Sequence, residues 1–245
     1  MIPGTLRALA LPALAAAAVA FASSGASAAE PTNTGKRFRF HGELDVLSFS
    51  HFNPDGDGEN TNRLGFGFGR PTGADRLLVP PVWSLGFGYV FLGGNAIVGG
   101  RFAFNLDTEG DEDDGGPGGP VPSRTTAVSG QLVPYFRYLF LPGKRARPFI
   151  EGRFGFGGSA GSTRIETDPE QLYSFSEIHP IVGVGGGAHI FLIDAFSIDL
   201  ALTFDYAAPH TKGRSEVGDV IIEEDYSKDG DFINLAAQAG FSVWF

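Results

Sequence analysis

Apolar and polar side chains alternate along most of this chain with a period of two residues. The segment at 37–51 shows this most plainly, because Phe38 and Phe40 fall on one face of an extended chain and Arg39 and His41 on the other. Successive side chains of a β-strand point to opposite faces, so the alternation predicts strands. Segments of this kind lie at about 37–51, 77–91, 96–106, 125–140, 148–160, 178–192, 196–206 and 231–245.

The two faces of these predicted strands carry different chemistry. One face is almost uniformly large and apolar, and the other mixes glycine with charged residues. The interior of a closed eight-stranded barrel is narrow, so glycine beside paired charges fits it more easily than rows of phenylalanine. The pattern therefore predicts charged side chains inside and argues against a soluble barrel with an apolar interior. The predicted inward charges are Arg39, Glu43, Asp45, Arg101, Arg137, Glu151, Arg153, Asp199 and Asp205.

The connections between the predicted strands alternate in length. A lipid bilayer offers no water to backbone N–H and C=O groups, so a spanning sheet must close on itself. Short turns on one side and long loops on the other are typical of transmembrane barrels. We therefore predict an all-β fold, an antiparallel up-and-down transmembrane barrel of eight strands with both ends on the periplasmic, short-turn side. Long loops are expected at about 53–74, 107–124, 161–176 and 208–230, and short turns at about 92–95, 141–147 and 193–195.

Residues 1–28 have the pattern of an export signal. Arg7 is followed by an apolar, alanine-rich stretch and then by Ala26-Ser27-Ala28, the small-x-small pattern of a signal-peptidase site. The apolar stretch is short for a transmembrane helix, which disfavours a retained anchor. The absence of any cysteine excludes a lipoprotein anchor. Cleavage would leave a short segment, 29–36, before a barrel at 37–245.

The C-terminus continues the alternation to its last residue, with Phe241, Val243 and Phe245 on one face. Such an ending resembles the assembly signal of bacterial outer-membrane barrels, which the barrel-assembly machinery recognises. With the signal peptide and the alternating strands, the chain resembles the small outer-membrane barrel superfamily of the outer-membrane protein A-like, X-like and W-like proteins. No motif selects a subfamily. The resemblance implies the outer membrane of a Gram-negative-type bacterium, with outer-membrane lipid and lipopolysaccharide as partners.

Charge and composition narrow the function further. The formal net charge is −10, and removal of Arg7 with the signal would make it more negative. Nucleic acid requires a basic face, so it is not an expected partner. No later stretch is apolar for long enough to form a transmembrane helix.

The inward charges are the first candidate functional feature. They either pair into a plug that holds the barrel closed or line a wet passage that selects small solutes. His41, His179 and His189 share the inward face but have no metal-ligand spacing. In the first long loop Asp55, Asp57 and Glu59 alternate with glycine, which is a weak calcium candidate because the full twelve-residue pattern is missing.

Catalysis has little support in the sequence. Some eight-stranded barrels modify lipid A with a histidine, a serine and an acid near the outer rim. Here His51 beside Ser50 and His210 beside Thr211 are the candidates, and neither lies in a nucleophile motif. We expect a non-enzymatic barrel without a cofactor, either structural or forming a narrow pore for small solutes. The alternative is a surface adhesion protein that acts through its extracellular loops.

Overall fold

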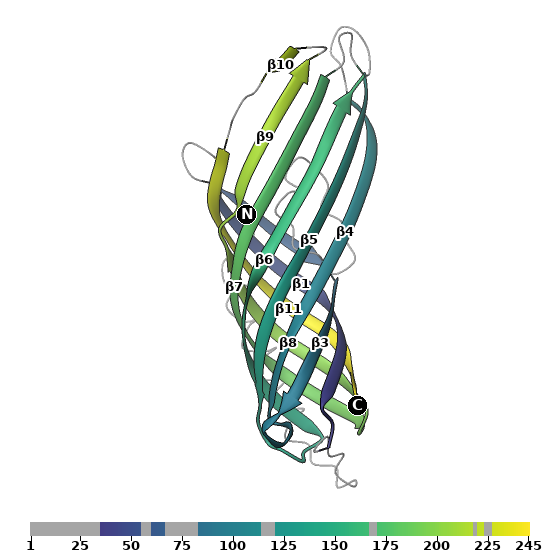
Figure 1. The fold of residues 1–245 in the computed structure, drawn as a ribbon, viewed down its shortest axis with the longest axis vertical. Helices are drawn as coiled ribbons and strands as arrows, with labels where there is room; N and C mark the ends of the chain where they lie inside the picture. Colours follow the sequence, from purple (N-terminus) through teal and green to yellow (C-terminus); the bar gives the residue numbers. More distant parts are fainter. Residues whose placement is uncertain are drawn as a thin grey trace, which may run out of the picture.

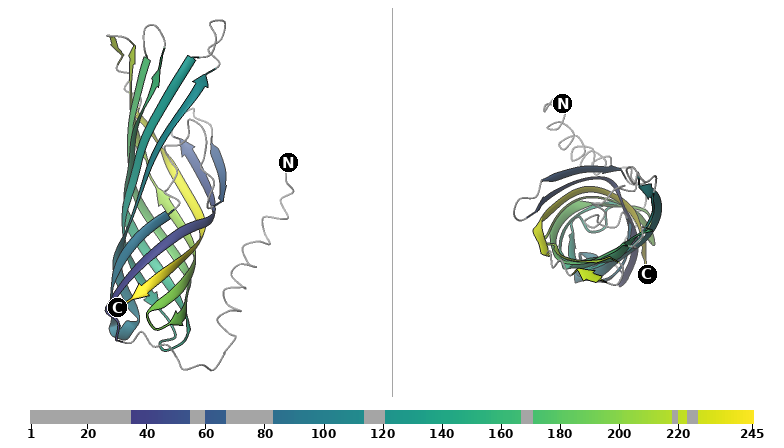
Figure 2. Two further views of the ribbon diagram at one scale, coloured as in Figure 1. Left: turned by 90° about the vertical axis from the view of Figure 1, so that its right-hand side faces the viewer. Right: turned by 90° about the horizontal axis from the view of Figure 1, so that it is seen from above.

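The computed structural model describes residues 35–54, 60–66, 83–113, 121–166, 171–217, 220–222 and 227–245. Eight of the strands in this part of the chain form a closed antiparallel ring, as predicted (Figures 1 and 2). None of the helices described there is long and apolar enough to cross a membrane. The ring strands are β1 (Phe38–Pro54), β3 (Trp83–Phe91), β4 (Ala96–Asp113), β5 (Val121–Leu139), β6 (Ala146–Ile165), β7 (Gln171–Ile193), β8 (Phe196–Ala207) and β11 (Ser227–Trp244).

The first and last ring strands close the barrel. β1 pairs with β11 from Arg39 opposite Trp244 to Pro54 opposite Gly230. Beyond this ladder, the backbone N–H of Phe38 donates to the carbonyl oxygen of Phe245 at 2.9 Å. The start of β1 and the end of the chain therefore lie together, at the end of the barrel that carries the short turns (Figure 1).

The three short turns lie where the sequence predicted them. A 3₁₀ turn, η2 (Leu92–Gly94), joins β3 to β4, residues 140–145 join β5 to β6, and two residues join β7 to β8. Gly93 and Gly143 both have positive φ, 66° and 77°. Glycine adopts this conformation without steric cost, which explains its place in both turns.

The long connections contain much more strand than predicted. β4 and β5 stay paired up to Asp113 opposite Val121, and β6 and β7 up to Ile165 opposite Gln171, so these spans were wrongly predicted as loops. The other two long connections hold β2 (Thr61–Phe66), β9 (His210–Val217) and β10 (Val220–Ile222). Figure 2 shows the resulting hairpins rising beyond the rest of the ring. The sequence did not predict these hairpins because glycine, threonine, serine and charged residues dominate them. A strand shows a hydrophobic period of two residues only when one of its faces is apolar.

The outer face of the ring is a belt of large apolar side chains, as the alternation predicted. A soluble barrel would hide such side chains from solvent, and a transmembrane barrel presents them to lipid. Ala188 was also expected on this face but is buried, since it lies between Pro148 and Leu200 on the neighbouring strands. The exposed members include Phe40, Phe87, Val98, Phe102, Leu132, Phe136, Ile150, Phe154, Val184, Leu200 and Phe204.

One irregularity in β1 changes which residues face outward. The pairing with β11 shifts between Asp45 and Leu47, the mark of a β-bulge. Before the bulge the even-numbered residues point out, as Phe40 does, and after it the odd-numbered Phe49 is exposed. After the bulge, β1 therefore turns its odd-numbered residues outward, whereas an uninterrupted strand would keep its even-numbered residues outward.

Candidate functional site

The barrel interior gathers the charged residues that the alternation assigned to it. Seven of the nine are buried, with at most 6% of their surface exposed. The other two, Asp45 and Asp205, are half-buried. The buried seven are Arg39, Glu43, Arg101, Arg137, Glu151, Arg153 and Asp199.

Two glutamates and two arginines form the centre of this interior. Glu151 accepts a hydrogen bond from Arg137 Nε at 2.8 Å and also contacts Arg101. Glu43 reaches the same two arginines from the other side of the ring, at 3.0 Å from Arg101 and 3.1 Å from Arg137. Each arginine thus bridges both carboxylates. Since buried charge is stable only when it is paired and hydrogen-bonded, the four side chains fix one another.

Asp199 organises a second group of contacts beside the first. Its carboxylate accepts hydrogen bonds from Arg39 Nη2 and from Ser197 Oγ, both at 2.8 Å. Ser242 Oγ donates to the same carboxylate and accepts from Arg39 Nε at 2.8 Å. Arg39 also lies 3.5 Å from Glu43, so the two groups form one connected set, here called the charge network.

His189 joins the two halves of the charge network and its protonation follows from its neighbours. Arg137 Nη1 lies 3.0 Å from His189 Nε2, and Asp199 Oδ1 lies 2.5 Å from Nδ1. A guanidinium can only donate and a carboxylate can only accept. The ring is therefore neutral, with its proton on Nδ1.

Two of the inward positions of β3 are glycines because larger neighbours occupy their space. A Cβ on Gly86 would lie 2.2 Å from a ring carbon of His41, and one on Gly88 would lie 2.7 Å from the hydroxyl of Tyr135. His41 is fully buried, with its ring edge-on to Tyr135. The ring of strands is therefore filled from wall to wall at this level.

Toward the short turns the interior becomes apolar. Trp244 is buried there, with Nε1 donating to Ser197 Oγ at 3.1 Å and its ring 5.2 Å from that of Phe191. We call this set the apolar cluster. Its members are Val90, Ile97, Tyr135, Leu139, Phe149, Phe191 and Trp244.

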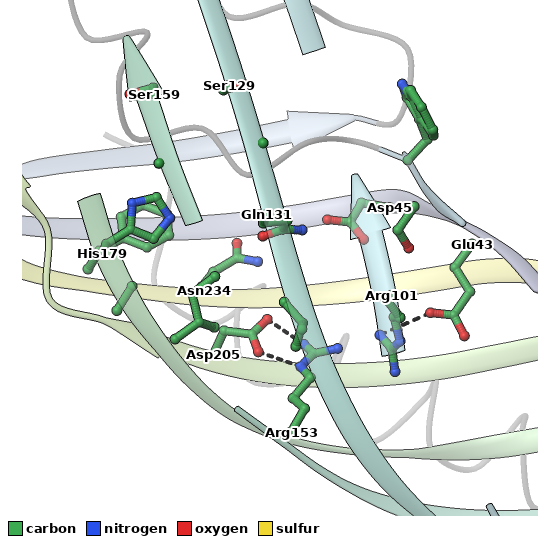
Figure 3. A pocket seen from close by; sticks show the side chains of 18 of the residues that line it. Glu43, Asp45, Arg101, Ser129, Gln131, Arg153, Ser159, His179, Asp205 and Asn234 are labelled. Carbon is green, nitrogen blue, oxygen red and sulfur yellow. Dashed lines mark hydrogen bonds and ion pairs between the residues drawn. The ribbon is translucent and has the colours of Figure 1, made fainter. Parts of the chain in front are cut away.

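On the other side of the charge network, toward the long hairpins, lies a cavity of about 80 Å³ (Figure 3). Arg153 and Asp205 form an ion pair on its wall, with Arg153 Nε donating at 2.5 Å. Asp45 also lines it and accepts a hydrogen bond from Gln238 Nε2 at 2.7 Å. The cavity therefore carries charged and amide groups on a wall that also includes apolar residues such as Val133, Ile181 and Phe232.

The sequence analysis missed the residues of the apolar cluster and also Arg147 and Glu177. Arg147 is buried and donates to Asn95 Oδ1 at 2.8 Å. Tyr135 is buried within the apolar cluster, and Glu177 is buried beside His179, with His179 Nδ1 2.8 Å from Glu177 Oε1. Arg147 fell at the edge of its predicted strand and Glu177 just outside one. Strand limits are the least certain part of a sequence-based assignment, which accounts for both.

The remaining sequence candidates are placed as follows. Asp55, Asp57 and Glu59 lie outside the described residues. Within the described ranges, no group of three or more histidine, aspartate or glutamate side chains is arranged to hold a metal ion. His51 contacts Asn62 Oδ1 at 2.9 Å through Nδ1.

The predicted assembly residues lie on the outer face of β11 and at its end. Phe241, Val243 and Phe245 are all exposed there. This placement leaves their side chains accessible from outside the barrel.

No protein-family model matches the chain, and no curated protein matches it. Three solved structures that resemble it are Neisserial surface protein A, Ail of Yersinia pestis and the outer-membrane protease OmpT of Escherichia coli. Their sequence identities are 9%, 14% and 7%, and their TM-scores 0.33, 0.39 and 0.46. The matches cover 85%, 84% and 85% of this chain and 97%, 99% and 97% of those chains. By its own closed ring of eight strands and its outward apolar belt, this chain has the fold of a small outer-membrane β-barrel.

Proposed function

We propose that this protein is a closed, non-enzymatic outer-membrane barrel with a structural role, rather than a pore. The observation that carries this proposal is the burial of the charge network. Arg39, His41, His189, Ser197 and Ser242 have no surface accessible to water. A side chain that lines a water-filled passage is wetted by it, so these residues support a barrel that is closed at their level.

Two further features support closure. The charge network links opposite walls of the ring, because Glu43 on β1 and Glu151 on β6 share Arg101 and Arg137. The apolar cluster then fills the end of the barrel that carries the short turns. An ion would have to cross both layers, the first by displacing paired charges and the second by entering an apolar packing.

The proposal includes the orientation and the export route. A signal peptide over 1–28 would direct the chain to the periplasm. There the barrel-assembly machinery would recognise Phe241, Val243 and Phe245. The short turns and both ends of the barrel would then stay periplasmic. The long hairpins would extend among the lipopolysaccharide at the cell surface.

The decisive experiment is single-channel recording of the refolded mature chain in a planar bilayer. We expect no discrete conductance steps from the wild type. The test pair is a double variant, Arg101→Ala with Arg153→Ala, and a control, Arg214→Ala, which removes an exposed arginine of β9. A shift in gel mobility on heating should first show that each protein is folded.

The recordings separate the two functions. Discrete wild-type steps whose size or ion selectivity changes in the double variant but not in Arg214→Ala would overturn the proposal and assign a pore. A silent wild type supports a closed barrel. Conductance that appears only in the double variant would add that the paired charges themselves hold it shut.

A further inference from the structure

The cavity above the charge network contains an acid, Asp45, that forms no recorded ion pair within 4 Å in the described chain. Asp199, Asp205, Glu43 and Glu151 each contact an arginine within 4 Å. Asp45 differs, because among the described residues its one recorded hydrogen bond comes from the neutral amide of Gln238. A half-buried carboxylate whose recorded hydrogen bond comes from a neutral amide would gain from a cation in direct contact, so the cavity favours a positively charged occupant.

The groups around Asp45 present hydrogen-bond acceptors. Gln238 uses its Nε2 to donate to Asp45 Oδ1, which leaves Gln238 Oε1 and Asp45 Oδ2 to accept. Gln131 lines the same cavity from β5, and within the described chain its amide has no hydrogen bond (Figure 3). Asp45 Oδ2, Gln238 Oε1 and the amide oxygen of Gln131 are thus three acceptors from two walls of the barrel. A primary ammonium carries three N–H donors and matches that number.

Asn234 adds a donor to the same cavity. Asn234 is buried, with 3% of the residue exposed. Its Oδ1 accepts a hydrogen bond from Ser50 Oγ at 3.0 Å, so its Nδ2 is the group left to interact. Asn234 lines the cavity, and within the described part of the molecule no hydrogen bond from that nitrogen is recorded, so it can donate to an occupant. An oxygen atom of the bound molecule, close to its ammonium group, would accept a hydrogen bond from this nitrogen.

Other ligand classes fit this cavity less well. A divalent metal would need a set of carboxylate or imidazole ligands that the described residues do not bring together. An anion would have to compete with the carboxylates that already hold Arg101 and Arg153. The volume of about 80 Å³ leaves room for about five to eight water molecules, at roughly 10–15 Å³ each on the same measure, hence for a ligand of few atoms.

We propose that this cavity binds a small primary ammonium ion with a hydroxyl group on the neighbouring carbon. Asp45 supplies the counter-charge, Gln131 and Gln238 accept the remaining N–H groups, and Asn234 donates to the hydroxyl oxygen. This goes beyond the closed-barrel proposal and does not depend on it, because a cavity of this kind binds its ligand whether or not the barrel conducts.

The test is isothermal titration calorimetry of the refolded mature barrel in detergent micelles. The probes are ethanolammonium, ethylammonium and tetramethylammonium chlorides. We expect ethanolammonium to bind most tightly, ethylammonium more weakly, and tetramethylammonium, which has no N–H group, not at all. The absence of ethanolammonium binding to the wild type, or equal binding of tetramethylammonium, would overturn the proposal without any variant.

Matched variants on the wall of the barrel locate the site. Asp45→Asn should weaken ethanolammonium binding at least tenfold, and Asn234→Ala should remove the preference for ethanolammonium over ethylammonium. The control is Asp231→Asn, which neutralises an exposed acid on β11, the strand that also carries Asn234 and Gln238. Unchanged affinity in a folded Asp45→Asn variant, or the same loss in Asp231→Asn, would contradict the assignment.

Discussion

The guanidinium of Arg137 lies over the ring of Phe149, with its Cζ atom 3.8 Å from the ring centroid. This contact joins the charge network to the apolar cluster. A desolvated contact of this type contributes about 2 kcal/mol. Since Arg137 also donates to Glu151, one face of its guanidinium packs on a hydrocarbon surface while its edge satisfies a carboxylate. The closed interior is therefore continuous from the polar layer to the apolar one.

The first prediction concerns the carboxylate at the centre of the network. Glu151→Gln keeps the shape of the side chain but removes a charge that Arg101 and Arg137 share. Breaking one side of a buried ion pair leaves uncompensated charge, and we expect the free energy of unfolding to fall by about 3–5 kcal/mol. Urea unfolding of the refolded barrel in lipid vesicles, followed by tryptophan fluorescence, measures it.

The matched control for this variant is Glu216→Gln. Glu216 pairs with Arg214 at 2.9 Å on the exposed hairpin strand β9. Exposed ion pairs contribute about 0–1 kcal/mol, so this change should have little effect. Equal losses in the two variants would mean that the interior charges are not more important for stability than surface ones.

The second prediction uses the two tryptophans of the chain as reporters of its two faces. Trp83 is 42% exposed on the outer wall, whereas Trp244 is 1% exposed inside the apolar cluster. In a Trp244→Phe variant, the fluorescence of Trp83 should be strongly quenched by lipids with brominated chains. In a Trp83→Phe variant, the fluorescence of Trp244 should resist both these lipids and aqueous iodide. Iodide quenching of Trp244 would instead show that water reaches the interior at the short-turn end.

The third prediction tests the bulge in β1. The chain has no cysteine, so single cysteines can be introduced and labelled without background. Because the bulge falls between Asp45 and Leu47, Val46→Cys and Phe49→Cys should both face outward in the refolded barrel. A lipid-soluble maleimide should label both at similar rates, and Ser48→Cys much more slowly. Slow labelling at 49 with fast labelling at 48 would show an uninterrupted strand.

Particular residues show how far the sequence leads to the site. Arg101 and Glu151 could be assigned to the inner face from alternation alone, because the direction of a strand side chain depends only on its place in a period of two. Their contact with each other could not be assigned. The strands of a barrel are tilted and staggered, so the residues that meet inside it depend on the offset accumulated around the ring. That offset is a property of the closed sheet.

The sequence by itself determined the class of fold, the number of ring strands, the three short turns and the apolar outer face. All of these follow from local periodicity and from the turn preferences of glycine. Only the tertiary structure decided that the long connections continue as hairpins and that Trp244 and Tyr135 fill the short-turn end. It also decided that, of the five acids predicted to face inward, Asp45 is the one without a recorded ion pair to an arginine in the described chain. These features depend on contacts between strands distant in sequence, and such contacts exist only once the ring has closed.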